Sequence, residues 1–133
     1  ETQVNGSSRN YIAYCFAEVE GFSKISSYVG NGSTNGPFVH TGFRPAWVIL
    51  KRTNATQEWQ LYDDKRSPFN PVTKRLQPNA TNAEDDLSPG DNELDFLSNG
   101  FKLIEDNGGM NASGATYIYM AFAEQPFKTA NAR

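Results

Sequence analysis

The sequence predicts an all-β protein, an antiparallel β-sandwich with jelly-roll-like connections. Aromatic side chains make up 13% of its 133 residues, and such rings are enriched in strands because they pack well on a half-buried pleated surface. Short apolar runs alternate along the chain with turn signals rich in Gly, Pro and Asn. This spacing is typical of sandwiches and jelly rolls, in which many short strands are joined by tight turns.

Seven apolar or alternating runs predict the strands. In chain order they cover residues 11–17, 26–29, 46–51, 59–62, 95–97, 101–104 and 116–123. The most distinct pair lies in residues 94–104, where two alternating runs flank Ser98, Asn99 and Gly100. An Asn-Gly pair can supply the positive φ of a tight turn, so this segment predicts a β-hairpin.

The segment of residues 67–91 reads differently, because it holds four of the seven prolines. Proline cannot donate to a central ladder, so we expect a long loop or a pair of short edge segments there. The one candidate helix lies at residues 83–87. It would be a single turn at most, because Pro89 and Gly90 stop it.

A nine-residue motif occurs near both ends of the chain. Residues 10–18 (NYIAYCFAE) match residues 116–124 (TYIYMAFAE) at an offset of 106, and the Asn-x-Ser triplets at residues 5–7 and 111–113 align as well. The same turn-then-strand unit is therefore expected at both ends of the chain.

The repeat has two interpretations. In the first, residues 1–24 correspond to the closing strand of a preceding module in a tandem array, and residues 25–133 form the complete β-sandwich module. In the second, two terminal strands of one sandwich merely look alike. In either case the first strand must pair beside residues 117–123 in the same sheet or with the open edge of a neighbouring chain.

The candidate assembly residues are the large apolar side chains of this first strand, Tyr11, Ile12, Tyr14 and Phe16. Strand exchange through residues 10–18 would link copies into a homo-oligomer or a fibre. The single cysteine, Cys15, lies in the same run, where a packed thiol is expected because free cysteine is among the most buried residue types.

Charge and hydropathy exclude two classes of partner. Twelve basic and fifteen acidic residues give a net charge of −3, which argues against a general electrostatic grip on nucleic acid or on an anionic membrane. The longest apolar run, residues 46–50, has five residues, far below the ~20 residues of a spanning helix. We therefore expect neither nucleic-acid binding nor membrane insertion.

No motif for covalent, phosphate or zinc chemistry is present in the sequence, so we expect no catalytic residue, no metal and no cofactor. His40 is interpreted as a structural histidine near a turn. The acidic residues at 84–86 and 91–95 predict solvated loops, with a calcium site as the alternative. A glycosidase pair drawn from Glu58, Asp63 and Asp64 is a second alternative, since such enzymes use two carboxylates.

The two tryptophans lie in different contexts. Trp47 falls in a continuous apolar run and is expected in the core. Alternation places Trp59 and Leu61 on one face of their strand and Tyr62 on the other.

If the tryptophan face is buried, Tyr62 faces solvent. Tyr62, Asp63 and Arg66 then form a candidate carbohydrate-binding patch, in which a ring stacks on a sugar and charged groups bind its hydroxyls. The alternative is a strand that simply leads into a charged loop.

Five segments carry a resemblance to a known family. They are residues 11–24, 28–39, 41–52, 95–102 and 114–124. In order and spacing they resemble an uncharacterised module near the C-termini of bacteriophage tail and tail-fibre proteins. The resemblance implies a virion structural protein, commonly with lectin-like β-sandwich modules upstream, located in the virion tail or fibre or outside the cell.

Together these observations predict a non-enzymatic structural and adhesion protein of a tail fibre or filament, with host-surface glycan as its candidate ligand. Weak contacts repeated along a fibre would multiply one another through effective concentration. The alternatives are a purely structural, self-assembling filament subunit and a glycoside hydrolase that depolymerises polysaccharide.

Overall fold

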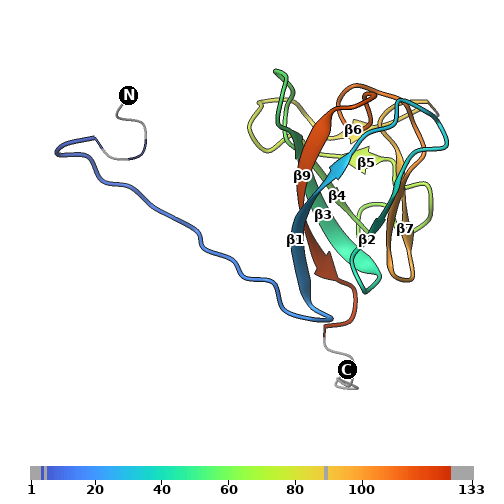
Figure 1. The fold of residues 1–133 in the computed structure, drawn as a ribbon, viewed down its shortest axis with the longest axis horizontal. Coiled ribbons are helices and arrows are strands. Elements are labelled where there is room, and N and C mark those ends of the chain that lie inside the picture. Colours follow the sequence, from blue (N-terminus) through green and yellow to red (C-terminus); the bar gives the residue numbers. More distant parts are fainter. Residues whose placement is uncertain (1–3, 5, 89, 127–133) are drawn as a thin grey trace.

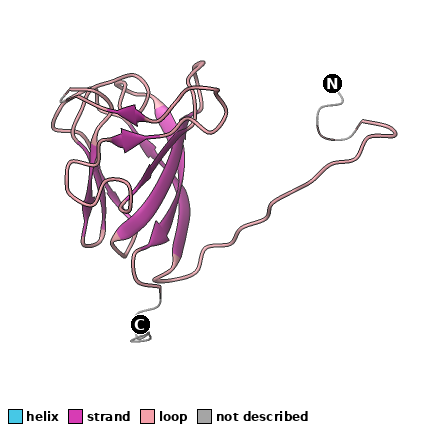
Figure 2. Ribbon diagram, turned by 180° about the vertical axis from the view of Figure 1, so that it is seen from behind, coloured by secondary structure: helices cyan, strands magenta, loops and turns pink. Residues whose placement is uncertain are grey.

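A computed structural model describes residue 4, residues 6–88 and residues 90–126 of the chain. This part of the chain is all-β, as predicted (Figure 2). The strands are β1 (Ser23–Val29), β2 (Phe38–His40), β3 (Pro45–Arg52), β4 (Gln60–Asp63), β5 (Lys74–Arg75), β6 (Asp85–Asp86), β7 (Leu94–Leu97), β8 (Gly100–Leu103) and β9 (Thr116–Ala123). Within the described residues, no helix is long and apolar enough to cross a membrane.

The strands form two main antiparallel sheets that face each other across one core. The first sheet has the order β1-β9-β3-β4 and the second the order β2-β8-β7, while β5 and β6 make a small separate ladder. In Figure 1, β2 and β7 lie across the core from β1 and β9. The fold is therefore consistent with the predicted antiparallel β-sandwich, and the jelly-roll connection pattern stays a prediction.

β9 is a central strand of the first sheet. It pairs with β1 on one side and with β3 on the other, in both cases antiparallel. Its sequence alternates, so that Tyr117, Tyr119 and Ala121 are buried in the core while Ile118 is exposed on the outer face. Such alternation follows from the two-residue period of a strand.

Aromatic side chains fill the space between the two sheets. The Phe101 ring of β8 meets the Tyr28 ring of β1 and the Tyr119 ring of β9 edge-on, with ring centroids 6.1 and 5.3 Å apart. Tyr28 also stacks on Tyr117 at 5.0 Å. Aromatic pairs in these geometries add to the stabilisation that comes from burying their area.

The turn that leads into β9 is fastened by one fully buried amide, Asn111. Its Nδ2 donates to the carbonyl oxygens of Ser33 and Glu105, both at 2.8 Å, and to Asn31 Oδ1 at 3.1 Å. Its Oδ1 accepts the Asn31 backbone N–H at 2.9 Å. Asn111 therefore joins two loops, β1–β2 and β8–β9, at the end of the sandwich from which β9 starts.

Six of the seven predicted strands are confirmed, with shifts of up to three residues at their ends. The predicted strand at residues 11–17 is wrong, because these residues pair with no other strand of the described chain and lie exposed. The single helical turn at residues 83–87 is wrong as well, since β6 occupies part of it. The expectation of two short edge segments in residues 67–91 is met by β5 and β6.

The predicted hairpin is confirmed, but its turn works differently from the expectation. β7 and β8 pair from Leu94 with Leu103 to Leu97 with Gly100, while neither Asn99 nor Gly100 has a positive φ. Gly100 is needed for close approach instead, because a Cβ there would meet the Val39 carbonyl oxygen of β2. The glycine lets β2 pack directly against β8.

The N-terminal arm, defined here as residues 6–18, extends away from the sandwich. In Figures 1 and 2 it leaves the base of β1 as a long irregular trace. One aromatic contact fastens its end, where the Phe16 ring meets the Phe122 ring of β9 with centroids 6.1 Å apart. The arm is thus an extended segment that its own sandwich does not cover.

Candidate functional site: the N-terminal arm and its base

The arm exposes all four predicted assembly residues. The exposed fractions are 46% for Tyr11, 83% for Ile12, 82% for Tyr14 and 56% for Phe16. A soluble monomer seldom leaves several large apolar side chains open in one segment, and such patches commonly mark interaction sites. Cys15 is exposed too, so the expectation of a packed thiol is wrong, because the strand that should have buried it is not formed.

Polar contacts hold the base of the arm against β1. Ser23 Oγ donates to the Ala17 carbonyl oxygen at 2.8 Å and accepts the Val19 N–H at 3.1 Å. Lys24 Nζ lies 3.0 Å from Glu18 Oε2, and the Ile25 N–H donates to Glu18 Oε1 at 3.2 Å. The hydrogen bond from Lys24 lowers the pKa of the Glu18 carboxyl. These contacts fix the direction in which the arm leaves the sheet.

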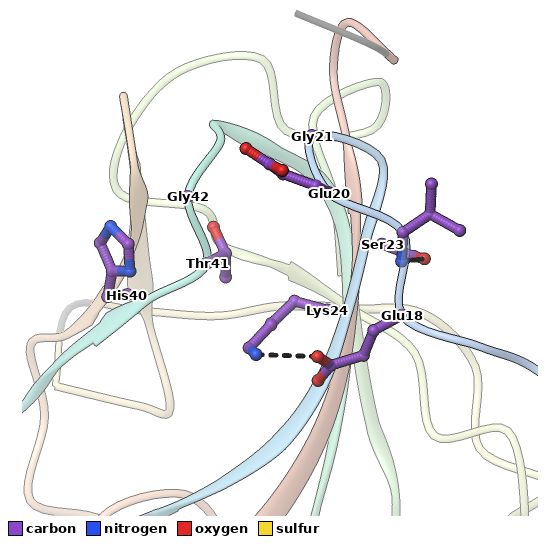
Figure 3. Close-up of a pocket in the computed structure, with 9 residues that line it drawn as sticks. Glu18, Glu20, Gly21, Ser23, Lys24, His40, Thr41 and Gly42 are labelled. Carbon is purple, nitrogen blue, oxygen red and sulfur yellow. Dashed lines mark hydrogen bonds and ion pairs between the residues drawn. The ribbon is translucent and has the colours of Figure 1, made fainter.

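A cavity of about 530 Å³ lies beside this base. Figure 3 shows Glu18 and Lys24 on one wall and His40, Thr41 and Gly42, at the end of β2, on the other. Thr41 Oγ1 donates to the Phe43 carbonyl oxygen at 2.6 Å. His40 is exposed at the end of β2, beside the Phe38 ring. The walls carry the charged side chains of Glu18, Glu20 and Lys24, while more than half of the lining surface is apolar.

The predicted carbohydrate-binding patch is wrong in its central residue. Tyr62 is fully buried, and its hydroxyl hydrogen-bonds Gln60 Oε1 at 2.8 Å and the Asn92 carbonyl oxygen at 2.7 Å. Burial raises the pKa of this hydroxyl. β4 turns the face of Gln60 and Tyr62 inward because the tyrosine hydroxyl finds partners in the core, while Trp59 and Leu61 lie half-buried on the outer face.

The other two residues of that patch bind each other. Arg66 Nε lies 2.6 Å from Asp63 Oδ2, and Arg66 Nη1 lies 2.8 Å from Glu84 Oε2. Burial acts to raise the pKa of Asp63, but the hydrogen bonds from Arg66 outweigh it and the pKa is lowered. Asp63 and Arg66 thus stabilise the loop after β4, with no aromatic ring of that strand beside them to stack on a sugar.

A shallow apolar groove of about 350 Å³ runs over the outer face of the first sheet. It is lined by Phe16, Trp47, Ile49, Trp59, Pro78, Asn79 and Met120. Trp47 was expected in the core and is instead half-buried on this face, because its neighbour Val48 takes the inward position. The end of the arm, through Phe16, forms part of the same groove.

The acidic residues of the first segment, 84–86, form ion pairs. Asp85 pairs with Arg75 and Asp86 with Lys74, each at 2.6 Å. In residues 4, 6–88 and 90–126, no group of three or more His, Cys, Asp or Glu side chains is placed to hold a metal ion. Within that part of the chain, the calcium alternative therefore has no ligand cluster.

The sequence indicated the four apolar residues of the arm, but it did not indicate the role of Asn111 or the cavity beside the base of the arm. The signal for Asn111 was present in the repeat, since the asparagine of each Asn-x-Ser triplet aligns with the other. Nothing in the spacing of Glu18, Ser23 and Lys24 relative to His40 indicated that they meet.

The fold and the arm define a class of protein, an antiparallel β-sandwich module with a projecting, extended N-terminal segment. The chain belongs to the family described as domain of unknown function DUF7483, which matches residues 1–126. No curated protein and no solved structure matches the chain. Because the family match spans the arm as well as the sandwich, the arm is part of the family's domain.

Proposed function

We propose that the protein is a non-enzymatic structural module of a fibre or filament, joined to a neighbouring module by its N-terminal arm. The observation that carries the proposal is the exposed apolar surface of Tyr11, Ile12, Tyr14 and Phe16. Fully burying one large apolar side chain stabilises a complex by about 1.5–3 kcal/mol. Covering this arm with a partner therefore supplies a strong driving force for association.

The sandwich offers a partner surface for such an arm. β1 lies at the edge of the first sheet, and an edge strand presents unpaired backbone groups that an extended segment can bind by strand addition. The edge at β4 is partly covered, since Leu61 is bridged to Leu76. The edge at β1 is bridged at Ser23 to Val19, and the Ile25 N–H is bonded to Glu18. The rest of this edge, residues 26–29 of a second copy, is the seat proposed for the arm of a complete chain.

The resemblance to modules of bacteriophage tail and tail-fibre proteins supports a place in a virion tail or fibre, outside the host cell. In such a particle the module would serve attachment as well as structure. Repetition along a fibre lets weak individual contacts act together through effective concentration. The alternative function, a purely structural, self-assembling filament subunit, differs from this proposal only in that the module binds no ligand.

The proposal is tested by measuring the mass and shape of the full chain with light scattering and electron microscopy. We expect oligomers or filaments, and we expect the double variant Ile12→Ser with Tyr14→Ser to stay at the monomer mass of 14.8 kDa. Phe69→Ser is the matched control, because Phe69 is as exposed as Tyr14, at 82%, but lies outside the arm. A full chain that is monomeric at all concentrations, or a control that dissociates like the double variant, would refute arm-driven assembly.

Glycan binding is a second candidate function. The groove on the outer face of the first sheet is a better candidate glycan site than the predicted patch of Tyr62, Asp63 and Arg66. Trp47 and Trp59 are half-buried there beside the amide of Asn79, and aromatic faces next to a polar group suit a sugar ring. We expect tryptophan fluorescence to change on titration with a bound glycan, and Trp59→Leu to weaken that binding at least tenfold. A glycan panel without any response would exclude this candidate.

The same panel tests the hydrolase alternative. Release of shortened sugars that is abolished by Asp63→Asn or Glu58→Gln would establish an enzyme. The non-enzymatic proposal expects every glycan to be recovered intact.

A further inference from the structure

The arm repeats the segment that closes the sandwich in its conformation as well as in its sequence. Residues 4–18 align with residues 110–124 at the offset of 106. Ser8 has a φ of 58°, and Gly114, at the aligned position, has a φ of 70°. A left-handed backbone is uncommon for a residue other than glycine, so its recurrence at Ser8 marks a shared turn.

A side chain-to-backbone hydrogen bond recurs at the same positions. The Gly6 N–H donates to the Tyr11 hydroxyl at 2.7 Å, and the Ala112 N–H donates to the Tyr117 hydroxyl at 2.9 Å. In both segments the hydroxyl of a tyrosine thus accepts a hydrogen bond from the residue five positions before it, at the start of the turn. Tyr117 does this inside the core, whereas Tyr11 does it on the projecting arm.

A backbone hydrogen bond recurs as well. The Arg9 N–H donates to the Gly6 carbonyl oxygen at 3.3 Å, and the Ala115 N–H donates to the Ala112 carbonyl oxygen at 3.1 Å. The arm therefore carries the turn of the closing segment already formed, in the absence of the loops that surround that turn in the sandwich.

The surroundings are what differ between the two segments. Met110 and Tyr117 are fully buried, whereas their counterparts Val4 and Tyr11 are exposed. Cys15 is exposed, and its counterpart Ala121 is fully buried in the core. The arm therefore has the turn of the closing segment, while the buried surroundings of that segment are not present around it.

The side chains of the arm also suit that position. Its inward positions would be Tyr11, Ala13 and Cys15, all small or aromatic, and its outward positions would include Ile12 and Phe16. The outward counterparts are Ile118, which is exposed, and Phe122, which is half-buried. The one charged residue among the buried positions is Arg9, which takes the place of the buried Ala115, so its long side chain must carry the charge out to solvent from there.

We propose that the arm, residues 6–18, is a second closing segment with a preformed turn, and that it fills the β9 position of another copy of this fold, between its β1 and its β3. The inference rests on the proposed function and names the seat of the arm. In a complete chain the β9 position is taken by the chain's own residues 116–123, so this seat exists only in a copy in which that position is open. A linear array of this kind needs leading modules that lack a β9 of their own, each completed by the arm of the chain that follows it.

Two fusions test this seat with the full chain in place. In the first, residues 19–109 precede residues 4–133, so that Val4 follows Gly109 as Met110 does in the chain. In the second, residues 19–126 precede residues 4–133, so that the leading module keeps its own β9. Cys15 is the only cysteine in either fusion, and its reaction with a thiol reagent reports whether it is buried.

We expect Cys15 to react on the order of 100-fold more slowly in the first fusion than in the second fusion or in the unfused chain, because burial in a stable strand limits access to opening events. Tyr11→Ala should remove this protection, since its counterpart Tyr117 is fully buried, while Ile12→Ala should not, since Ile118 faces outward. Both variants should leave the second fusion unchanged.

Three results would overturn the inference: equal reactivity of Cys15 in both fusions, equal effects of the two alanine variants, or a leading module that folds only in the second fusion. Oligomerisation of the full chain tests the proposed function separately. An oligomer combined with an unprotected Cys15 would retain arm-driven assembly and exclude the β9 seat. A monomeric full chain combined with a protected Cys15 in the first fusion would exclude arm-driven assembly and retain the β9 seat.

Discussion

At the scale of single residues, the buried amide of Asn111 is the contact on which the end of the sandwich depends. Its hydrogen bonds reach Asn31, Ser33 and Glu105, which lie in loops far apart in the sequence. Replacing it would leave several partly buried backbone groups unpaired, and each group that is shielded from water costs about 1–3 kcal/mol.

Asn111→Ala should therefore lower the free energy of unfolding by about 3 kcal/mol or more. The measurement is a urea denaturation curve of the variant beside the parent chain. Asn54→Ala is the matched control, because Asn54 is exposed and accepts a single hydrogen bond from Arg52. Equal losses for the two variants would contradict the role given to Asn111.

Glu93 supplies a prediction of pH dependence. The residue is buried, and no described residue hydrogen-bonds its Oε1. Burial raises the pKa of Glu93, and the nearby Glu105 and Asp91 raise it further. A carboxyl whose pKa is raised by folding favours the native state while it is protonated, and this stabilisation is lost as the pH rises through the folded-state pKa.

Glu93→Gln, which resembles the protonated acid, should therefore match the parent chain in stability at about pH 4 and exceed it at about pH 7. The gain should be about 1 kcal/mol, the lower end of the cost of an unpaired buried polar atom. Urea denaturation at the two pH values measures it. A variant that is less stable than the parent chain at the higher pH would show that the carboxylate makes a favourable contact.

At the scale of elements, apolar runs were enough to locate the two long strands. β3 and β9 each span eight residues, most of them apolar. β2, with three residues, and β5 and β6, with two each, are too short to show a period, and tertiary packing decides them.

The face of β4 could not be predicted for a different reason. Alternation shows which residues share a face of a strand and leaves open which face is buried. Trp59 and Leu61 were the more apolar pair, yet the core took Tyr62, whose hydroxyl bonds Asn92. In the arm, the sequence has the apolar pattern of a strand, but no neighbouring strand is present to pair with it. The sequence pattern alone therefore could not show that the arm lies outside the sheet.

The contact of β8 with β2 gives a prediction at this scale. A Cβ added at Gly100 would meet the Val39 carbonyl oxygen and, at 2.8 Å, the Phe38 ring. Gly100→Ala should destabilise the protein by about 1–3 kcal/mol, the usual effect of overpacking.

Gly108→Ala is the control for this prediction. The nearest atom to a Cβ at that position is the end of the Arg52 side chain, at 3.6 Å. Thermal unfolding should show a clear loss of stability for the first variant and little change for the second. Similar melting temperatures for both variants would mean that β2 can move away from β8 without loss.

At the scale of the whole molecule, the chain combines a closed sandwich with an arm that carries the features of a strand outside any sheet. Two seats can receive this arm. The edge at β1 is available beyond Ile25 in a complete copy, and the β9 position fits the preformed turn of the arm in a copy in which that position is free. Both seats place the arm beside β-strand backbone, so association should convert an exposed segment into a hydrogen-bonded strand.

The most direct measurement is hydrogen–deuterium exchange of the amides of residues 10–18 in the full chain at increasing protein concentration. If the arm joins modules, these amides should exchange at the rate of an open chain in dilute solution and at least about tenfold more slowly once copies associate, because paired amides exchange through opening. Exchange at the open-chain rate at every concentration would contradict the account, since it would show that the arm never becomes a strand.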